Sequence, residues 1–138
     1  MVGSVRQLQA QHIMVTVPKT LGQDALIAQV RAELEDDHVH MVLVVDSGGR
    51  LVTTIERDDL DPGTDDCSLA SRWGGLEGRT VQAKTPVPTI DRMLSTGRRR
   101  LAVVDDDRRL RGLVCLKRSR SGYCSDEDLR ARAHDVAR

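Results

Sequence analysis

Aromatic residues are almost absent from this chain: its 138 residues include no Phe, one Trp and one Tyr. Any hydrophobic core must therefore be built from Val, Leu, Ile, Met and Ala. Aromatic rings are also the surfaces on which proteins stack single-stranded bases, so the shortage disfavours that class of partner. A basic run, Arg98 to Arg100, could contact a nucleic acid, but three aspartates at 105–107 interrupt the basic region. We therefore expect no nucleic-acid partner.

Motifs for catalysis, metal binding and membrane insertion are missing as well. The three cysteines, Cys67, Cys115 and Cys124, lack CxxC spacing, so neither a disulfide framework nor a zinc site is predicted. The pair His38 and His40 lacks a third ligand within reach. There is no P-loop, dinucleotide fingerprint or nucleophile–histidine–acid arrangement, so we expect no enzymatic activity. Without a signal peptide or a long apolar run, we expect a cytoplasmic protein with no membrane partner.

The two halves of the chain carry opposite net charges, although the net charge of the whole chain is zero. Residues 1–69 carry 5 Lys/Arg and 12 Asp/Glu, a net of −7, and residues 70–138 carry 16 and 9, a net of +7. Opposed halves of this kind suggest surfaces that face each other within one chain or between chains. Solvated surface charge is the other interpretation, because exposed ion pairs contribute little.

The best-defined segment of the sequence runs from Met41 to Leu60. Apolar residues at Met41–Val45 and Leu51–Ile55 predict two strands, and the intervening Asp46-Ser47-Gly48-Gly49 is typical of a turn. A helical turn is expected at Glu56–Leu60. Upstream, Thr20 is a candidate N-cap for a helix that runs to about Asp37, with an apolar stripe at Leu26, Ile27, Val30 and Leu34.

The second half of the chain repeats this pattern. Val44-Val45-Asp46 matches Val103-Val104-Asp105 at an offset of 59 residues, and Leu51 matches Leu110 at the same offset. A second, shorter helix is expected at about Pro88 to Thr96, and Ser125 is a candidate cap for a last helix.

These matches divide the chain into three parts. We expect a first repeat with its lead-in at 1–62, a linker at 63–78, and a second repeat with the C-terminal helix at 79–138. A short helix is predicted between Cys67 and Trp73, and Trp73 is expected to fill an apolar seam between the halves.

This ordered set of motifs resembles the CBS domain pair, the regulatory module named after cystathionine β-synthase. The resemblance extends over nearly the whole chain after about residue 10, and it rests on the Ile13–Pro18 segment and on the strand–turn–strand segments of both halves. It implies an α+β fold in which two βαββα repeats pack sheet to sheet with pseudo-twofold symmetry. It also implies a regulatory or sensor function and a homodimer that acts on an effector protein, which the sequence does not identify.

The CBS family commonly binds adenosine-type ligands, such as AMP, ADP, ATP or S-adenosylmethionine, in clefts between the repeats. A Thr/Ser-x-x-Asp element serves this purpose, because its hydroxyl can contact phosphate and its carboxylate can accept both ribose hydroxyls. In this chain the element reads Glu56-x-x-Asp59 in the first repeat and Cys115-x-x-Arg118 in the second. Asp59 keeps the ribose acceptor, whereas Glu56 places negative charge where a phosphate would lie.

Two interpretations of the ligand site follow from the resemblance. In the first, one site survives at Asp59 and Glu56, walled by Thr16 and Val17, and it prefers an uncharged nucleoside or S-adenosylmethionine. Arg57 or the run Arg98 to Arg100 could still meet a phosphate there. In the second, both sites are vestigial and the chain is a ligand-free protein-interaction or dimerisation module. The opposed charges of the halves favour an antiparallel dimer in either case.

Overall fold

The architecture is a tandem repeat of strand, helix, strand and strand, as the sequence predicts. The computed structural model describes residues 8–120 and 122–127. The first repeat contains β1 (Thr20–Gly22), α2 (Ile27–Leu34), β2 (Val42–Val45), β3 (Leu51–Ile55) and a 3-10 turn, η1 (Arg57–Asp59). The second contains β4 (Thr80–Gln82), α3 (Val87–Leu94), β5 (Arg100–Val104) and β6 (Leu110–Cys115). A short helix precedes each repeat, α1 (Ala10–Ile13) and the 3-10 turn η2 (Ala70–Arg72).

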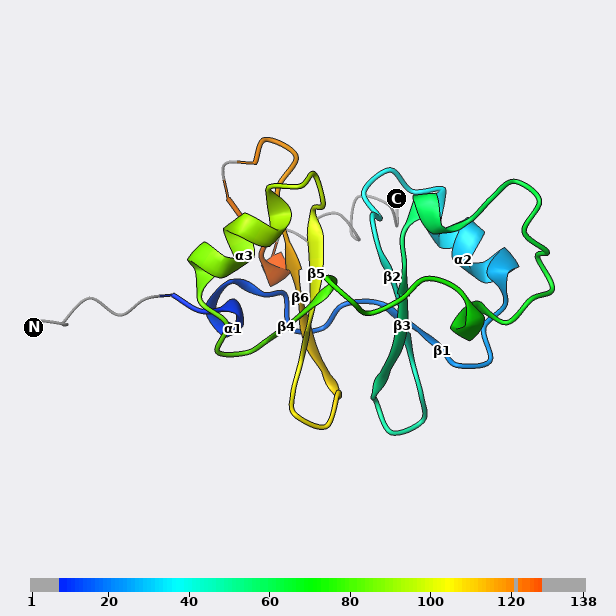
Figure 1. Cartoon of the computed structure of the whole chain (residues 1–138), viewed down its shortest axis with the longest axis horizontal. Coiled ribbons are helices and arrows are strands. Elements are labelled where there is room, and N and C mark those ends of the chain that lie inside the picture. The colour runs from blue at the N-terminus through cyan, green and yellow to red at the C-terminus, as the bar shows by residue number, and fades with distance from the viewer. Residues whose placement is uncertain (1–7, 121, 128–138) are drawn as a thin grey trace, which may run out of the picture.

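Each repeat forms a three-stranded mixed sheet with the same topology. β2 lies between β1 and β3 in the first sheet, and β5 lies between β4 and β6 in the second. In both sheets the first pair of strands is parallel and the second is antiparallel, with an irregularity at the same place, Val44/Val45 and Val103/Val104. The central strands are buried on both faces, which explains their unbroken apolar sequences. Figure 1 shows α2 and α3 on the outer flanks, with the strands between them.

The expectation that Thr20 caps a helix is wrong. Thr20 pairs with Leu43 as the first residue of β1, so tertiary strand pairing overrides the local capping signal. Helix α2 begins only at Ile27, and there the Leu26 backbone N–H donates to Gln29 Oε1 at 2.9 Å. The helix also ends at Leu34 rather than near Asp37. Ile27, Val30 and Leu34 of the predicted apolar stripe are buried as expected, whereas Leu26 caps the helix and is exposed.

Three apolar clusters form the core, and one of them lies between the two repeats. One cluster joins α2 to the first sheet and a second joins α3 to the second sheet. The third joins the inner faces of the sheets, and it consists of Val15, Met41, Leu43, Leu51, Ala102, Val104 and Leu113. The sheets therefore pack face to face, as the resemblance implies, and aliphatic side chains alone fill the interface.

The two β-hairpins join the repeats through reciprocal hydrogen bonds. The Leu51 backbone N–H donates to Arg108 O at 2.8 Å, and the Leu110 backbone N–H donates to Gly49 O at 3.0 Å. The 59-residue offset relates the two donors, Leu51 and Leu110, and also the two acceptors, Gly49 and Arg108, so these bonds give the pseudo-twofold relation a direct structural basis.

The segment that precedes each repeat packs on the other repeat. Val15 forms a two-way backbone bridge with Leu113 of the second sheet, and Gly75 forms the equivalent bridge with Thr54 of the first. Trp73 accordingly packs against the cluster of the first repeat instead of filling a seam between the halves, so that expectation is wrong. The domain boundaries themselves stay a prediction.

The predicted C-terminal helix begins after Ser125 and falls largely on residues 128–138, which lie outside the described part. Among the helices that are described, none has the length and apolar content that a bilayer span requires.

Gly112 is where the N-terminal segment approaches the second sheet most closely. A Cβ at this position would lie 2.5 Å from Val15 O and 2.6 Å from Met14 Sδ. Only glycine therefore allows the Val15–Leu113 bridge to form without displacing the crossing segment.

We predict that Gly112→Ala lowers the free energy of unfolding by about 1–3 kcal/mol, because the added methyl overpacks this contact. Urea denaturation measures the change. Gly63→Ala is the matched control, since a Cβ at Gly63 meets nothing within 4 Å. Equal stability of the two variants would contradict the proposed close approach.

Candidate functional site

Asp59 and Glu56, the residues on which the sequence interpretation rests, belong to an ion-pair network between the repeats. Asp59 accepts two hydrogen bonds from Arg79, from Nη1 to Oδ2 at 2.5 Å and from Nη2 to Oδ1 at 2.8 Å. Glu56 accepts two from Arg98, from Nε at 2.7 Å and from Nη2 at 3.1 Å. A further contact of 3.6 Å joins Arg79 to Glu56. Two acids of the first repeat thus meet two arginines from the second half of the chain.

The network is partly shielded from water, which strengthens it. The side chain of Arg79 is 15% exposed and that of Asp59 is 18% exposed. The hydrogen bonds from Arg79 hold the pKa of Asp59 below its ordinary value, and the same bonds raise the pKa of Arg79. The Glu56 backbone N–H also donates to Asp59 Oδ2 at 2.8 Å, which fixes the carboxylate at the start of η1. Asp59 is therefore already engaged by protein donors.

The structure does not bring the other predicted site residues to Asp59. Arg57 donates to the carbonyl oxygens of Leu34 and Asp36, beyond the end of α2. Thr16 bonds Asp126 through its backbone N–H, at 2.7 Å, and through its hydroxyl, at 2.9 Å. Val17 is 84% exposed. Of the five predicted residues, only Glu56 and Asp59 share one network.

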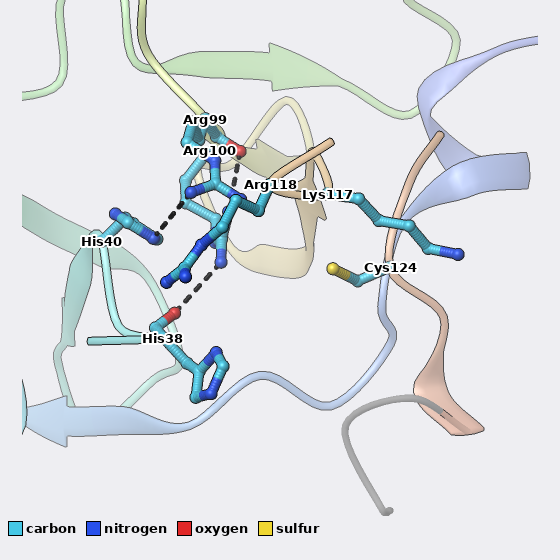
Figure 2. Close-up of a pocket in the computed structure, with 7 residues that line it drawn as sticks. All are labelled: His38, His40, Arg99, Arg100, Lys117, Arg118 and Cys124. Atoms are coloured by element: carbon cyan, nitrogen blue, oxygen red, sulfur yellow. Dashed lines mark hydrogen bonds between the residues drawn. The ribbon is translucent and has the colours of Figure 1, made fainter. Parts of the chain in front are cut away.

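A pocket of about 420 Å³ lies elsewhere between the repeats and is strongly cationic. Residues just before β2, at the start of β5 and just after β6 line it: His38, His40, Arg99, Arg100, Lys117, Arg118 and Cys124. Four of these seven residues are Lys or Arg, and none is Asp or Glu. Figure 2 shows Arg99, Arg100 and Arg118 gathered next to His40.

Arg100 forms the buried floor of this pocket. It is only 5% exposed, and its guanidinium donates to the carbonyl oxygens of Leu116, at 3.2 Å, and His38, at 3.1 Å. These bonds tie the approach to β2 in the first repeat to the end of β6 in the second. The cation therefore has a structural role as well as an electrostatic one.

His40 is neutral at neutral pH because of its surroundings. Burial, together with the positive charges of Arg100, Arg99, Arg57 and Arg118, lowers the pKa of His40 to about 4. Arg99 Nη1 lies 3.2 Å from His40 Nε2, so the neutral ring can accept a hydrogen bond there. The imidazole therefore adds no charge to the pocket, where burial and the neighbouring arginines both disfavour its protonation.

Arg99 supplies the clearest unsatisfied group in the pocket. Its Nε is buried and has no hydrogen-bond partner among the described residues. A buried donor without an acceptor is costly, and a bound anion would satisfy it. Guanidinium groups bind phosphate and other oxyanions through charge-assisted, bidentate hydrogen bonds, so the clustered arginines suit the pocket to an anion.

The sequence contained a signal for this pocket that motif matching alone missed. His40 and Arg99 are related by the 59-residue repeat offset, and so are Asp59 and Arg118. The comparison of the two motif copies already placed Arg118 where the first repeat carries Asp59, but it did not bring Arg118 together with Arg99 and His40. No such rule predicts Cys124, which reaches the pocket through the chain after β6.

Comparison with solved structures decides the fold. The CBS domains of a transcriptional regulator from Streptococcus pneumoniae superpose with a TM-score of 0.66 at 13% identity, covering 78% of this chain and 92% of that one. The CBS domain pair of protein MJ0100, in complex with 5′-methylthioadenosine and S-adenosyl-L-methionine, has a TM-score of 0.65 at 20% identity and covers 96% and 100%. CBSX2 in complex with AMP has a TM-score of 0.65 at 20% identity and covers 95% and 99%.

The chain has the fold of a CBS domain pair. The resemblance stated from the sequence is thereby confirmed at the level of fold. No family profile and no curated protein matches this chain in sequence. Its described residues contain no group of three His, Cys, Asp or Glu side chains that could hold a metal ion.

The Asp59–Arg79 pair should stabilise this CBS pair measurably. We predict that Asp59→Asn lowers the free energy of unfolding at pH 7 by about 1–2 kcal/mol, because the substitution removes a shielded, bidentate ion pair. The contribution exists above the ordinary Asp pKa of 3.8 and is lost as the pH falls through the depressed pKa of the folded state. Wild type and variant should therefore converge in stability in acid.

Denaturant unfolding between pH 7 and pH 3 tests this expectation. Asp66→Asn is the control, because the Asp66 side chain is 62% exposed in its ion pair with Arg31 and should contribute little. A difference between wild type and Asp59→Asn that stays constant with pH would rule out the ion pair as its cause.

Proposed function

We propose that this protein is a non-enzymatic regulatory CBS module that binds a phosphate-bearing adenine nucleotide in the pocket between its repeats. The observation that carries the proposal is a pocket of about 420 Å³ with four cationic side chains and no carboxylate in its described lining. Support for the nucleotide class comes from structures of the same fold, one in complex with AMP and another with adenosine-derived ligands.

The phosphates are the part of the ligand that this pocket is suited to recognise. Arg99 and Arg118 can each offer two donors in a planar fork to phosphate oxygens, and Lys117 adds a point charge. Arg118 stands at the repeat position of Asp59, so the second repeat offers a cation where a ribose acceptor would be expected. Affinity should therefore depend on phosphate charge more than on ribose contacts.

The regulatory step would follow from where the pocket lies. His38 and His40 belong to the first repeat, whereas the four cations belong to the second. An anion held by both sides would favour the arrangement of the repeats that brings them together, and a bound effector protein would sense that shift. A cytoplasmic location is part of this proposal.

We predict that affinity rises in the order adenosine, AMP, ADP, ATP, and that S-adenosylmethionine, which carries a sulfonium cation, binds weakly. Isothermal titration measures the series, and higher salt should weaken ATP binding because the contacts are ionic. Arg118→Glu should weaken ATP binding roughly tenfold or more, since charge-assisted hydrogen bonds are lost and a repulsion is added.

Arg111→Glu is the matched control for this series, because Arg111 is exposed on β6 and does not line the pocket. Equal loss of affinity in both variants would mean that only the overall charge matters. ATP binding that survives Arg118→Glu but not Asp59→Ala would instead favour the site at Asp59.

A ligand-free interaction module is the second candidate function, and one observation favours it. Arg79 occupies both carboxylate oxygens of Asp59, so the ribose acceptor expected from the family motif is held by the protein itself. Failure of adenosine, AMP, ADP, ATP and S-adenosylmethionine to bind would leave this candidate as the better one.

We also propose that the module forms a homodimer. The opposed charges of the two halves are used in part within the chain, where Arg79 and Arg98 meet Asp59 and Glu56. Apolar contacts should therefore contribute much of any dimer interface. Light scattering across a salt series is expected to show a dimer that persists at high salt, and dissociation by salt would instead indicate the antiparallel charge pairing.

A further inference from the structure

The cysteines Cys115 and Cys124 lie opposite each other on neighbouring antiparallel segments. Leu116 and Tyr123 form an antiparallel bridge, and one residue further along each segment come Cys115 and Cys124. The Cys124 backbone N–H donates to Cys115 O at 2.7 Å, which fixes this register. Directly opposed residues of an antiparallel pair project from the same face.

This placement suits a disulfide. Opposed residues in a hydrogen-bonded antiparallel pair have Cα atoms about 5.5 Å apart, and disulfides form across Cα separations of about 4.4–6.8 Å. Both residues are thiols in this structure.

The pocket gives one of the two sulfurs a route to solvent. Both are buried, Cys115 at 2% and Cys124 at 8% exposed, but of the two only Cys124 is among the residues that line the cationic pocket. Lys117 and Arg118 line it too, so an oxidant that carries carboxylates would be drawn toward Cys124. Cys67, by contrast, is exposed and is not among the residues that line this pocket.

We propose that Cys115 and Cys124 form a reversible intramolecular disulfide at the edge of the pocket. The oxidant is a low-molecular-weight disulfide such as oxidised glutathione. The Cys124 thiolate attacks one sulfur of the oxidant and releases one thiol, and the Cys115 thiolate then attacks the Cys124 sulfur and releases the second. Both cysteines lose their protons, one S–S bond forms in the protein, and the oxidant is reduced to two thiols.

A disulfide would affect the two pocket cations, Lys117 and Arg118, that lie between the cysteines in sequence. A Cys115–Cys124 bond closes a ring that contains Lys117 and Arg118, which restricts the backbone on which both pocket cations are carried. Restricting groups in a binding arrangement reduces the entropy lost on binding. The redox state of the pair would thus adjust the pocket, although the disulfide itself does not depend on the proposed function.

Thiol counting on the Cys67→Ser protein tests this proposal. After incubation with oxidised glutathione, we expect the intact mass to fall by two hydrogens, both remaining cysteines to resist alkylation in denaturant, and dithiothreitol to reverse both changes. In Cys67→Ser/Cys115→Ala the intermediate cannot resolve, so a glutathione adduct on Cys124 is expected instead. Cys67→Ser/Cys124→Ser should gain neither product.

Two results would overturn the proposal. One is full alkylation of both cysteines after oxidation of a protein whose far-UV circular dichroism is unchanged. The other is a glutathione adduct on Cys67→Ser with no loss of hydrogen. Binding of tripolyphosphate and ATP is measured separately on the oxidised and the reduced protein. If the disulfide forms but ATP does not bind, the proposed function is contradicted and the disulfide proposal is not.

Discussion

Each sheet of this protein has two apolar faces, and a single repeat can cover only one of them. Its own helix packs on the outer face, α2 in the first repeat and α3 in the second. The inner face is buried only when the other repeat's sheet lies against it, through the cluster that includes Leu43, Leu51 and Leu113. Each of the larger side chains buried there contributes about 1.5–3 kcal/mol. With no Phe in the chain, this aliphatic contact is the constraint on which the pairing of the repeats and the clefts between them depend.

The pseudo-twofold relation holds for the backbone but has been lost in the charges. Asp59 of the first repeat corresponds to Arg118 of the second, and His40 corresponds to Arg99. As a result, one side of the repeat interface is closed by the protein's own ion pairs, and the other carries a pocket with excess positive charge. Equivalent positions in one fold therefore support different chemistry, because the side chains and not the backbone decide what each cleft can hold.

Sequence reasoning predicted the architecture well because it relied on long-range regularity. The 59-residue offset and the buried valine strands identified the two repeats, and the hairpins confirm that offset through the Leu51–Arg108 and Leu110–Gly49 hydrogen bonds. Local signals were less reliable: Thr20 resembled a helix cap but lies in a strand, since its pairing with Leu43 depends on residues distant in sequence. The partners of Asp59 and Glu56 could not be predicted for the same reason, because Arg79 reaches Asp59 and Arg98 reaches Glu56 only after the repeats have packed together.

We propose that anions bind at the cationic pocket and not at Asp59. The most direct measurement is an NMR titration of the ¹⁵N-labelled protein with ATP at neutral pH. We expect saturable chemical-shift changes for His38, His40, Arg99, Arg100 and Arg118. The backbone amide resonances of Glu56, Asp59 and Arg79 should not shift. Saturable shifts confined to Glu56, Asp59 and Arg79, with the pocket residues unchanged, would contradict it.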